Sequence, residues 1–334
     1  MRARIAAIAY HLPEAVLDNT ELARRHPRFQ PDKLKAKTGI DRRHIAAAGE
    51  TAADLAVHAA ERLFTETGAE RAYVDYLIFC TQAPDYMLPT SACLIHQRLG
   101  LRAGAGALDI NLGCSGFVYG LGLAQGLIQS GQAARVLLLT ADTYSKFIDV
   151  DDLGVRSIFG DGAAATLIAA EPERDTGLGP FVYGTDGKGA EHLIVPTGGQ
   201  REPTADASYE IGTGEIRPGR PLHMNGPEVF NFTLGAVPAL VQETLAKAGL
   251  GMDEIDLFVF HQANSTMLEA LRRKLAIPGE KFFVDLDGGN TVSSTIPIAL
   301  HRAVEVGMLR TGMRVMLVGF GVGYSWAATI LVWG

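Results

Sequence analysis

Short apolar runs alternate along the chain with longer segments in which apolar residues recur every three or four positions. The runs are VDYLIFC (74–80), ARVLLLT (134–140), AAATLIA (163–169), IDLFVF (255–260), RVMLVGF (314–320) and AATILVW (327–333). The segments with helical spacing are 52–67, 115–130, 237–249 and 266–276. Continuous apolar runs predict strands buried on both faces, and their alternation with helices predicts a layered α/β fold.

The two halves of the chain resemble each other. Three pairs of segments match in the same order and at an offset of about 180 residues: 74–83 with 255–263, 135–139 with 314–318, and 159–169 with 320–332. Buried strands share Val and Leu and therefore look alike, but the common order and the shared Arg-Val and Phe-Gly landmarks favour a duplication. We predict two copies of one unit, 1–172 and 173–334, joined within 171–220, where no strand pattern is evident.

Composition narrows the possible functions. The chain has 334 residues, of which 47% are hydrophobic and 20% charged, so it can bury a sizeable core. A net charge of −7 argues against a nucleic-acid partner. Because no apolar run approaches about 18 residues and the N-terminus does not resemble a signal peptide, we expect a cytoplasmic protein with no membrane span. The three cysteines lack metal-ligand spacing, so no metal site is expected from them.

Cys114 is the first candidate for chemistry. It lies between a short apolar segment that ends at Gly113 and a long helical pattern, and Gly116 follows it closely. This arrangement predicts a sharp strand-to-helix turn with the thiol at a helix N-terminus, where the helix dipole and free amides favour a thiolate. A buried structural thiol is the alternative, and it is our interpretation of Cys80 and Cys93, which lie in apolar runs.

Three further features join Cys114. His261 ends a predicted strand, and Asn290 follows a Gly-Gly turn near the position that the duplication pairs with Cys114. The glycine-rich segment GFGVGYSW (319–326) can direct backbone N–H groups into a site, or it can be a plain hairpin turn. It lacks the Gly-Lys-Ser/Thr of a phosphate loop. Each feature alone has an ordinary structural explanation, and the combination is more informative.

These residues together resemble the β-ketoacyl-ACP synthase III group of condensing enzymes. The resembling motifs are TGIDRRHI (38–45), PDYMLPTSA (84–92), GCSGF (113–117), FGDGAAA (159–165), MNGPEVF (224–230), HQAN (261–264), GGNTVSSTIP (288–297) and FGVGYSW (320–326). The resemblance implies a thiolase-like duplicated α-β-α-β-α layered fold and a homodimer. It also implies an acyltransferase that condenses an acyl thioester with malonyl-ACP by decarboxylative Claisen condensation, giving a 3-oxoacyl product in fatty acid biosynthesis.

The resemblance assigns roles to individual residues. It implies that Cys114 is the acyl-accepting nucleophile and that His261 and Asn290 drive decarboxylation. The oxyanion would be held by backbone amides of Cys114, Gly321 and Val322. The residues implied to bind substrate are Leu88, Phe159, Met224, Gly226, Phe230 and Asn264, with Leu88 at the dimer contact. No metal or redox cofactor is implied, because CoA or phosphopantetheine thioesters are the substrates.

Two departures from the family pattern concern the acyl donor. Neither Asp32 nor Lys33 is the aromatic residue that stacks on the adenine of CoA in many relatives, and Arg156 is out of register with the arginine on its other side. Stacking of this kind is worth about 1–3 kcal/mol per base, so the donor is expected to be weakly bound acyl-CoA or an acyl-ACP. The basic cluster Arg272–Lys274, comprising Arg272, Arg273 and Lys274, predicts a contact with the acidic carrier protein, or a solvated helix face.

Other functions remain open at this point. An acyltransferase of a dedicated pathway would move the acyl group from Cys114 to a hydroxyl, an amine or another acceptor. Hydroxymethylglutaryl-CoA synthase chemistry requires a carboxylate base where this chain has Gln82, which cannot act as a base. A non-catalytic partner subunit is disfavoured, because all three of Cys114, His261 and Asn290 are present.

Overall fold

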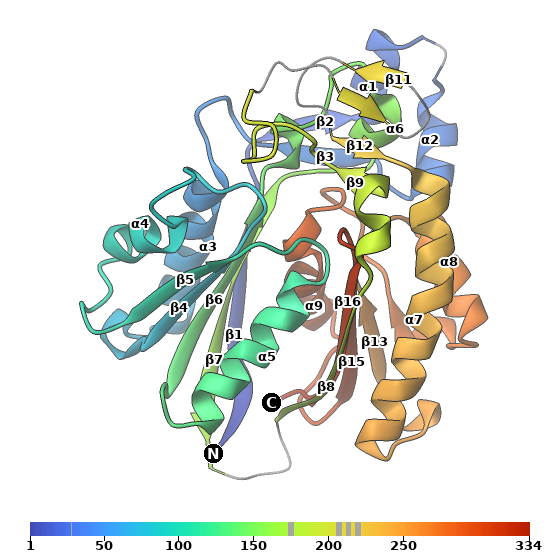
Figure 1. Cartoon of the computed structure of the whole chain (residues 1–334). Coiled ribbons are helices and arrows are strands. Elements are labelled where there is room, and N and C mark those ends of the chain that lie inside the picture. Colours follow the sequence, from blue (N-terminus) through green and yellow to red (C-terminus); the bar gives the residue numbers. More distant parts are fainter. Residues whose placement is uncertain (28, 173–176, 205–208, 212–214, 218–221) are drawn as a thin grey trace.

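The computed structural model describes residues 1–27, 29–172, 177–204, 209–211, 215–217 and 222–334. Two five-stranded sheets stack with two helices, α5 (Gly116–Gln129) and α9 (Thr295–Glu305), between them (Figure 1). The helices α3 (Ala52–Thr67) and α4 (Ser91–Arg98) cover the outer face of the first sheet. The outer face of the second is covered by α7 (Gly226–Ala248), against which α8 (Ser265–Lys274) packs. The layers therefore run α-β-α-β-α.

The two sheets have the same strand order and the same strand directions. The first is, in spatial order, β1 (Arg2–His11), β7 (Gly162–Glu171), β6 (Arg135–Asp142), β4 (Tyr76–Cys80) and β5 (Gly106–Ile110). The second is β8 (Leu178–Thr185), β16 (Ser325–Val332), β15 (Arg314–Gly321), β13 (Leu257–Phe260) and β14 (Phe282–Phe283). In each sheet the first three strands pair antiparallel and the last three parallel. Each pair of matching sequence segments falls on corresponding strands of the two sheets, as a duplication requires.

The central helices differ from the outer ones because both of their sides are covered. Apolar residues occur around most of α5, and they pack against strands of both sheets. The outer helix α3 is amphipathic and begins with a capping box. In that box Thr51 accepts from the Asp54 N–H (3.2 Å) and Asp54 accepts from the Thr51 N–H (2.8 Å). Gly68, with φ +67°, ends the helix.

Small elements cover one end of the stacked sheets (Figure 1). They are β2 (Ala15–Asp18), α1 (Asn19–Arg25), α2 (Pro31–Thr38), β3 (Arg42–Ile45), α6 (Leu153–Arg156), β9 (Leu193–Ile194), β10 (Tyr209–Ile211), β11 (Glu215–Arg217) and β12 (His223–Met224). Three short antiparallel pairs, β2–β3, β9–β12 and β10–β11, stay outside the two main sheets. Within the described residues, no helix is both long enough and apolar enough to cross a bilayer.

The structure confirms the six predicted strands, corrects three other predictions and adds one strand that was not predicted. The helix predicted at 237–249 begins at Gly226, because Asn225 caps it and Pro227 occupies its first turn, and it continues through Pro238. The predicted join at 171–220 contains β8, an edge strand of the second sheet. Strand β1 was not predicted from the sequence. Cys93 is exposed on α4, not buried.

The predicted division of the chain falls between the two sheets. All strands of the first sheet lie within residues 2–171, and those of the second lie within 178–332. The predicted boundary between 172 and 173 borders residues 173–176, which lie outside the described residues. The boundary itself therefore stays a prediction, and the sheets show which strands belong to each half.

Candidate active site

Cys114 lies at the turn between β5 and α5, directly before the N-cap residue Ser115. Its side chain is only 5% exposed. The turn is tight, since the Gly116 N–H donates to the Gly113 carbonyl (2.8 Å) and a Cβ at Gly116 would overlap the sulfur of Cys80. The chain therefore holds the thiol at the N-terminal end of α5, as the sequence predicted.

Two backbone N–H groups, those of Val322 and of Cys114 itself, lie near the Cys114 sulfur and act to lower the pKa of its thiol. Val322 lies on the turn between β15 and β16, which approaches the thiol closely. A Cβ at Gly321 would lie 2.8 Å from the Cys114 Sγ, and one at Gly319 would lie 2.8 Å from the Ser115 Cα. Glycine is thus needed at 321 for clearance, while Cys114 and Val322 supply donors. Donors aimed at this sulfur also lie close to the oxygen of a tetrahedral adduct on it.

His261 and Asn290 are linked in one buried network. His261 directly follows β13, and its Nδ1 lies 2.7 Å from the Thr295 hydroxyl. The Asn290 Oδ1 accepts from the Val292 N–H (2.9 Å), which directs the Asn290 Nδ2 toward the His261 Nε2, 3.4 Å away. The Thr295 hydroxyl also lies 3.2 Å from the Val292 carbonyl; when it donates to Nδ1 instead, the ring proton is on Nε2. The two side chains then present Nδ2–H and Nε2–H donors together.

The turn that carries Asn290 is fixed by the N-terminal half. The Asn290 N–H donates to Ile158 O (2.9 Å) and its carbonyl accepts from the Gly160 N–H (3.1 Å). Gly288 and Gly289 have φ +103° and +82°, in the region that favours glycine. A Cβ at Gly160 would overlap the Gly288 carbonyl oxygen. The segment 158–160 and the Gly-Gly turn therefore fit together only with glycines at these positions.

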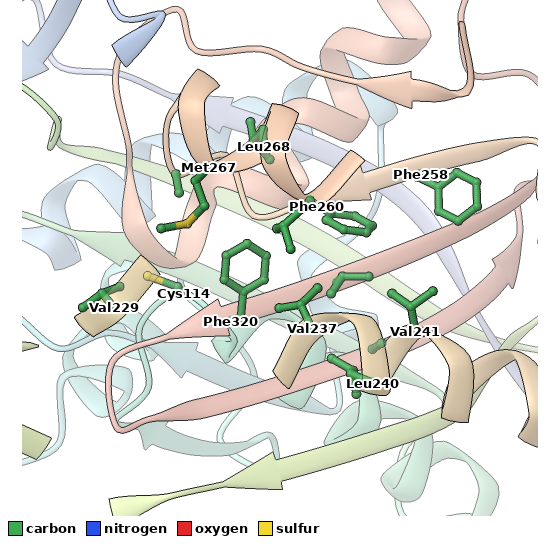
Figure 2. Packing of buried hydrophobic residues seen from close by; sticks show 14 of the residues in the cluster. Cys114, Val229, Val237, Leu240, Val241, Phe258, Phe260, Met267, Leu268 and Phe320 are labelled. Atoms are coloured by element: carbon green, nitrogen blue, oxygen red, sulfur yellow. The ribbon is translucent and has the colours of Figure 1, made fainter. Parts of the chain in front are cut away.

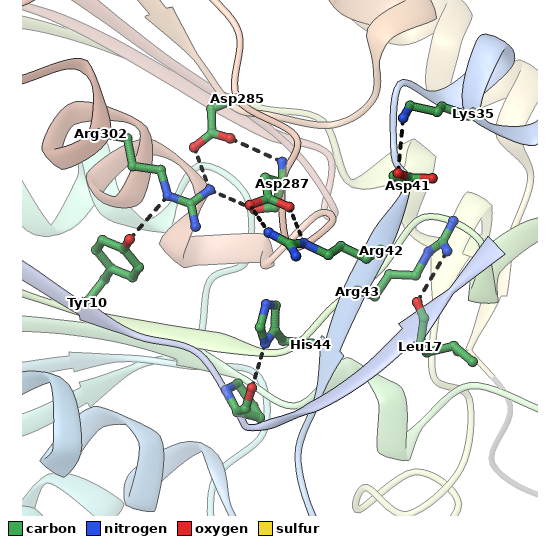
Figure 3. Close-up of polar contacts among 11 residues, drawn as sticks. Tyr10, Leu17, Lys35, Asp41, Arg42, Arg43, His44, Asp285, Asp287 and Arg302 are labelled. Carbon is green, nitrogen blue, oxygen red and sulfur yellow. Dashed lines mark hydrogen bonds and ion pairs between the residues drawn. The ribbon is translucent and has the colours of Figure 1, made fainter. Parts of the chain in front are cut away.

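Charged side chains support the same turn from outside (Figure 3). Arg42 makes a bidentate pair with Asp287 (2.6 and 2.8 Å). Arg302 donates to Asp285 (2.7 Å) and to the Asp287 carbonyl (2.8 Å). Arg43 is fully buried and donates to Ser157 O. The TGIDRRHI segment thus supports the Asn290 turn although the two lie some 245 residues apart.

A cavity of about 680 Å³ opens on Cys114, His261 and Asn290. The apolar side chains of Val229, Met267 and Phe320 lie around the thiol (Figure 2). Nine of the residues predicted for the site line this cavity: Cys114, Phe159, Met224, Gly226, Phe230, His261, Asn264, Asn290 and Gly321. The structure therefore brings together residues that the sequence places almost 180 positions apart.

Two groups of predicted residues lie outside the cavity. Leu88 is 82% exposed in the single chain. Arg272 and Arg273 both pair with Glu269, at 2.8 Å and 2.5 Å, so their charge is partly neutralised. These arginines hold the pKa of Glu269 at about 2 through their hydrogen bonds. The Arg272–Lys274 cluster is thus a less basic surface than the sequence suggests.

Burial dominates the protonation of the site. It raises the pKa of the Cys114 thiol to about 12; Asp142 raises this pKa further, and the Val322 and Cys114 N–H groups lower it. Burial lowers the pKa of His261 to about 3. The resting site therefore holds a neutral thiol and a neutral imidazole, which corrects the expectation that the helix N-terminus favours a thiolate.

This protonation state predicts the pH dependence of thiol alkylation. With a pKa raised to about 12, the thiolate fraction of Cys114 grows about tenfold per pH unit across the range where the protein is handled. In a Cys93→Ser background, where the exposed thiol is removed, the rate of alkylation by iodoacetamide should rise by about that factor per pH unit between about pH 6 and 9, without a plateau. A plateau near neutral pH would instead indicate a stable thiolate, and the burial argument would be wrong.

Three buried polar residues next to the site were missed from the sequence. Thr295 contacts His261, and Tyr144 donates to the Gln82 side chain (2.5 Å). Asp142, at the end of β6, accepts from the Gln82 N–H (2.8 Å) and from the Ser293 hydroxyl (2.5 Å). It thereby links the nucleophile half to the Asn290 turn, and burial raises its pKa to about 7. The one sequence signal for Thr295 and Asp142 is that each is a polar residue at the end of an apolar pattern.

The chain is similar to known proteins over nearly its whole length. Residues 108–187 match the family model for 3-oxoacyl-[acyl-carrier-protein (ACP)] synthase III, and residues 245–333 match the model for its C-terminal part. The beta-ketoacyl-[acyl-carrier-protein] synthase III of Xylella fastidiosa (strain Temecula1) is 38% identical over 98% of this chain and 98% of its own. That of Caldanaerobacter subterraneus subsp. tengcongensis is 33% identical over 99% and 98%.

A solved structure also matches over its whole length. A crystal structure of a 3-oxoacyl-(acyl-carrier-protein) synthase III is 53% identical, with a TM-score of 0.96 and full coverage of both chains. Together with the duplicated layers, this likeness identifies the fold as thiolase-like. The chain belongs to the 3-oxoacyl-[acyl-carrier-protein] synthase III family of condensing enzymes.

Proposed function

We propose that this chain condenses an acyl thioester starter with malonyl-ACP, through an acyl group on Cys114, to give a 3-oxoacyl-ACP. The observation that carries the proposal is the meeting of Cys114, His261 and Asn290 on one cavity large enough for an extended thioester arm. Membership of a family whose relatives carry the name beta-ketoacyl-[acyl-carrier-protein] synthase III supports it.

The first half-reaction is acyl transfer to sulfur. Cys114 Sγ attacks the thioester carbonyl, the carbon–sulfur bond to the donor breaks, and the thiol proton leaves with the donor thiol. The backbone N–H groups of Cys114 and Val322 hold the oxyanion of the tetrahedral intermediate. Because the thiol is neutral at rest, its proton departs during attack and not before it.

The second half-reaction is decarboxylation and carbon–carbon bond formation. The malonyl thioester oxygen accepts from the Asn290 Nδ2–H and the His261 Nε2–H, so the enolate formed when CO₂ leaves is stabilised. The enolate carbon attacks the acyl carbonyl on Cys114, the carbon–sulfur bond breaks, and the Cys114 thiolate that leaves takes up one proton from solvent to restore the thiol. A neutral His261 is suited to this role, since a donor is needed and no group must lose a proton.

The test of this proposal is release of CO₂ together with a new carbon–carbon bond. Protein incubated with acyl-CoA or acyl-ACP and carboxyl-labelled malonyl-ACP should release labelled CO₂ in step with 3-oxoacyl-ACP. A second candidate, transfer from Cys114 to a hydroxyl, an amine or another acceptor, rests on the polar, exposed Asp32 and Lys33 of α2. The same helix contributes Lys37 and Thr38 to the cavity lining. Acyl loss from Cys114 without CO₂ release would favour that candidate and contradict the first.

We propose that the chemistry needs no metal or redox cofactor. Each step above moves only an acyl group, CO₂ and protons, and the donors come from the chain itself. CoA and phosphopantetheine thioesters enter as substrates. Cys80, Cys93 and Cys114 are all free thiols, which supports a reducing, cytoplasmic location.

The carrier protein is proposed to contact the Arg272–Lys274 cluster on α8. The Arg273 side chain is 75% exposed, and Asn264, the N-cap residue of the helix, lines the cavity. We predict that Arg273→Glu raises the KM for malonyl-ACP about fivefold at low salt, because a rim charge acts mainly on association. The KM for malonyl-CoA should stay unchanged. Arg310→Glu, at an exposed arginine that precedes β15 and lies outside α8, is the control, and an equal effect there would contradict the contact.

A second copy of the chain is proposed to pair along β5. In the described part of the first sheet, β5 is an edge strand with one neighbour, and Tyr86, Met87 and Leu88 expose apolar side chains. We predict that Leu88→Asp shifts a dimer toward monomer in light scattering at micromolar protein, since a charge would enter the apolar contact. The same change at Val306, also exposed, should leave the mass unaltered; a monomeric parent protein would overturn this proposal.

A further inference from the structure

The N-terminal half of the chain holds a cluster of three side chains that can bind a metal ion: His11, Glu50 and His58. None of the three lines the Cys114 cavity. His11 ends β1, Glu50 precedes the N-cap of α3, and His58 lies in the second turn of that helix. One ligand atom of each lies within 4.8 Å of those of the other two. The proposed reaction uses none of these side chains.

The backbone around the three side chains is well fixed. His11 is in register with Ala163 at the end of the β1–β7 pair, and the capping box at Thr51 fixes the start of α3 next to Glu50. The Ala47 N–H donates to the Glu50 Oε2 (3.0 Å), which orients the carboxylate and leaves Oε1 available. Because His11 ends β1, while Glu50 precedes α3 and His58 lies in it, small side-chain rotations bring the three to a common ion.

The two imidazole rings already lie against each other. Their centroids are 4.8 Å apart and the rings meet edge to face at 72°. Tetrahedral ligands about 2.0–2.1 Å from a zinc ion lie roughly 3.4 Å from one another, so the ligand atoms, now within 4.8 Å, must approach one another by at most about 1.4 Å. His58 is exposed, which leaves the remaining coordination positions to water.

The local charges suit a divalent cation. Glu50 and Glu14 contribute negative charge nearby. Arg62, a positive charge that acts on His11, is bound to Glu66 (2.6 Å) and to the Tyr10 carbonyl (3.2 Å).

We propose that His11, Glu50 and His58 form a binding site for one Zn²⁺ ion. Two imidazole nitrogens and one carboxylate favour a borderline transition metal over Mg²⁺ or Ca²⁺, which prefer sets made only of oxygen. The ion would link the end of β1 to the start of α3 and so stabilise the first half of the fold. This site is separate from the proposed condensation and does not depend on it.

The test is a zinc titration of tag-free protein against a colour-indicating chelator, with His58→Gln and His96→Gln as a matched pair of variants. Cys93→Ser serves as the background, because an exposed thiol also binds zinc. The parent and His96→Gln should bind one more equivalent of Zn²⁺ than His58→Gln, whose affinity at this site should fall at least tenfold. Stoichiometric Zn²⁺ should raise the Tm of the parent and of His96→Gln only.

A second pair of variants tests the other ligands. His11→Gln and Glu50→Gln should each lose the same equivalent of zinc, and both should keep the condensing activity of the parent, since neither side chain touches the cavity. Equal zinc stoichiometry and equal Tm shifts in the parent and all three cluster variants would overturn the proposal. Circular dichroism spectra that match the parent verify that each variant is folded.

Discussion

Cys114→Ala is expected to abolish condensation, with a loss of about 10⁴-fold or more. The sulfur is the only group on the cavity to which the acyl chain is proposed to bond, and both oxyanion donors are aimed at it. The measurement is the rate of 3-oxoacyl-ACP formation, together with the protein mass after exposure to acyl-CoA. The variant should show no added acyl mass.

The same variant separates the two half-reactions. Because Cys114→Ala leaves His261 and Asn290 in place, slow loss of CO₂ from malonyl-ACP should persist while no carbon–carbon bond forms. Cys93→Ala is the matched control, since it removes an exposed thiol far from the chemistry and should keep full activity. Acyl mass on the Cys114→Ala protein would show that another residue carries the acyl group.

His261→Ala and Asn290→Ala should impair the half-reaction that Cys114→Ala spares, which is the loss of CO₂, and should spare acyl transfer. Each removes one donor to the malonyl thioester oxygen, and loss of a single oxyanion donor typically costs about 10²–10³-fold. Condensation and CO₂ release should fall by that factor, while acyl transfer to Cys114 continues. The readouts are labelled CO₂ and the acyl mass on the protein, measured on the same samples.

Asn290→Asp sharpens this prediction. It keeps the size of the side chain and the acceptor for the Val292 N–H, but it replaces the Nδ2 donor with a carboxylate oxygen. The repulsion between that carboxylate and the enolate should make the loss at least as large as for Asn290→Ala. Gln262→Ala, one residue from His261 but hydrogen-bonded to the Phe260 carbonyl, reports on structural damage alone. Equal losses of acyl transfer and condensation in Asn290→Asp would contradict the division of roles.

The duplication could be predicted from sequence because buried strands leave a strong pattern. In residues 134–140 and 314–320 an arginine is followed by an uninterrupted apolar run. This shared pattern predicted a buried strand in each half and indicated that the two strands correspond. Strand β8 gave no such signal: Gly179, Pro180 and Gly184 interrupt it, and it lies at a sheet edge. Helix α7 was predicted too short for a similar reason, since Pro238 falls inside it.

Site residues could be predicted from the sequence where they lie at a glycine-containing turn before a helix. Cys114 and Asn290 each follow glycines and precede a helix, and the structure places them at equivalent ends of α5 and α9. Thr295 and Asp142 act through tertiary contacts with His261 and Ser293, and local sequence does not reveal such contacts. The thiol pKa was mispredicted because helix position is local, whereas burial depends on the whole fold.

The most direct test of the central claim is a single-turnover chase followed by intact-protein mass spectrometry. Wild-type protein is first loaded with one acyl group, and malonyl-ACP is then added. The acyl mass on Cys114 should disappear at the rate at which 3-oxoacyl-ACP and CO₂ appear, and it should persist in Asn290→Ala. If the acyl mass instead leaves wild type without CO₂, or if product forms while the mass remains, the acyl-cysteine is not the intermediate of a decarboxylative condensation.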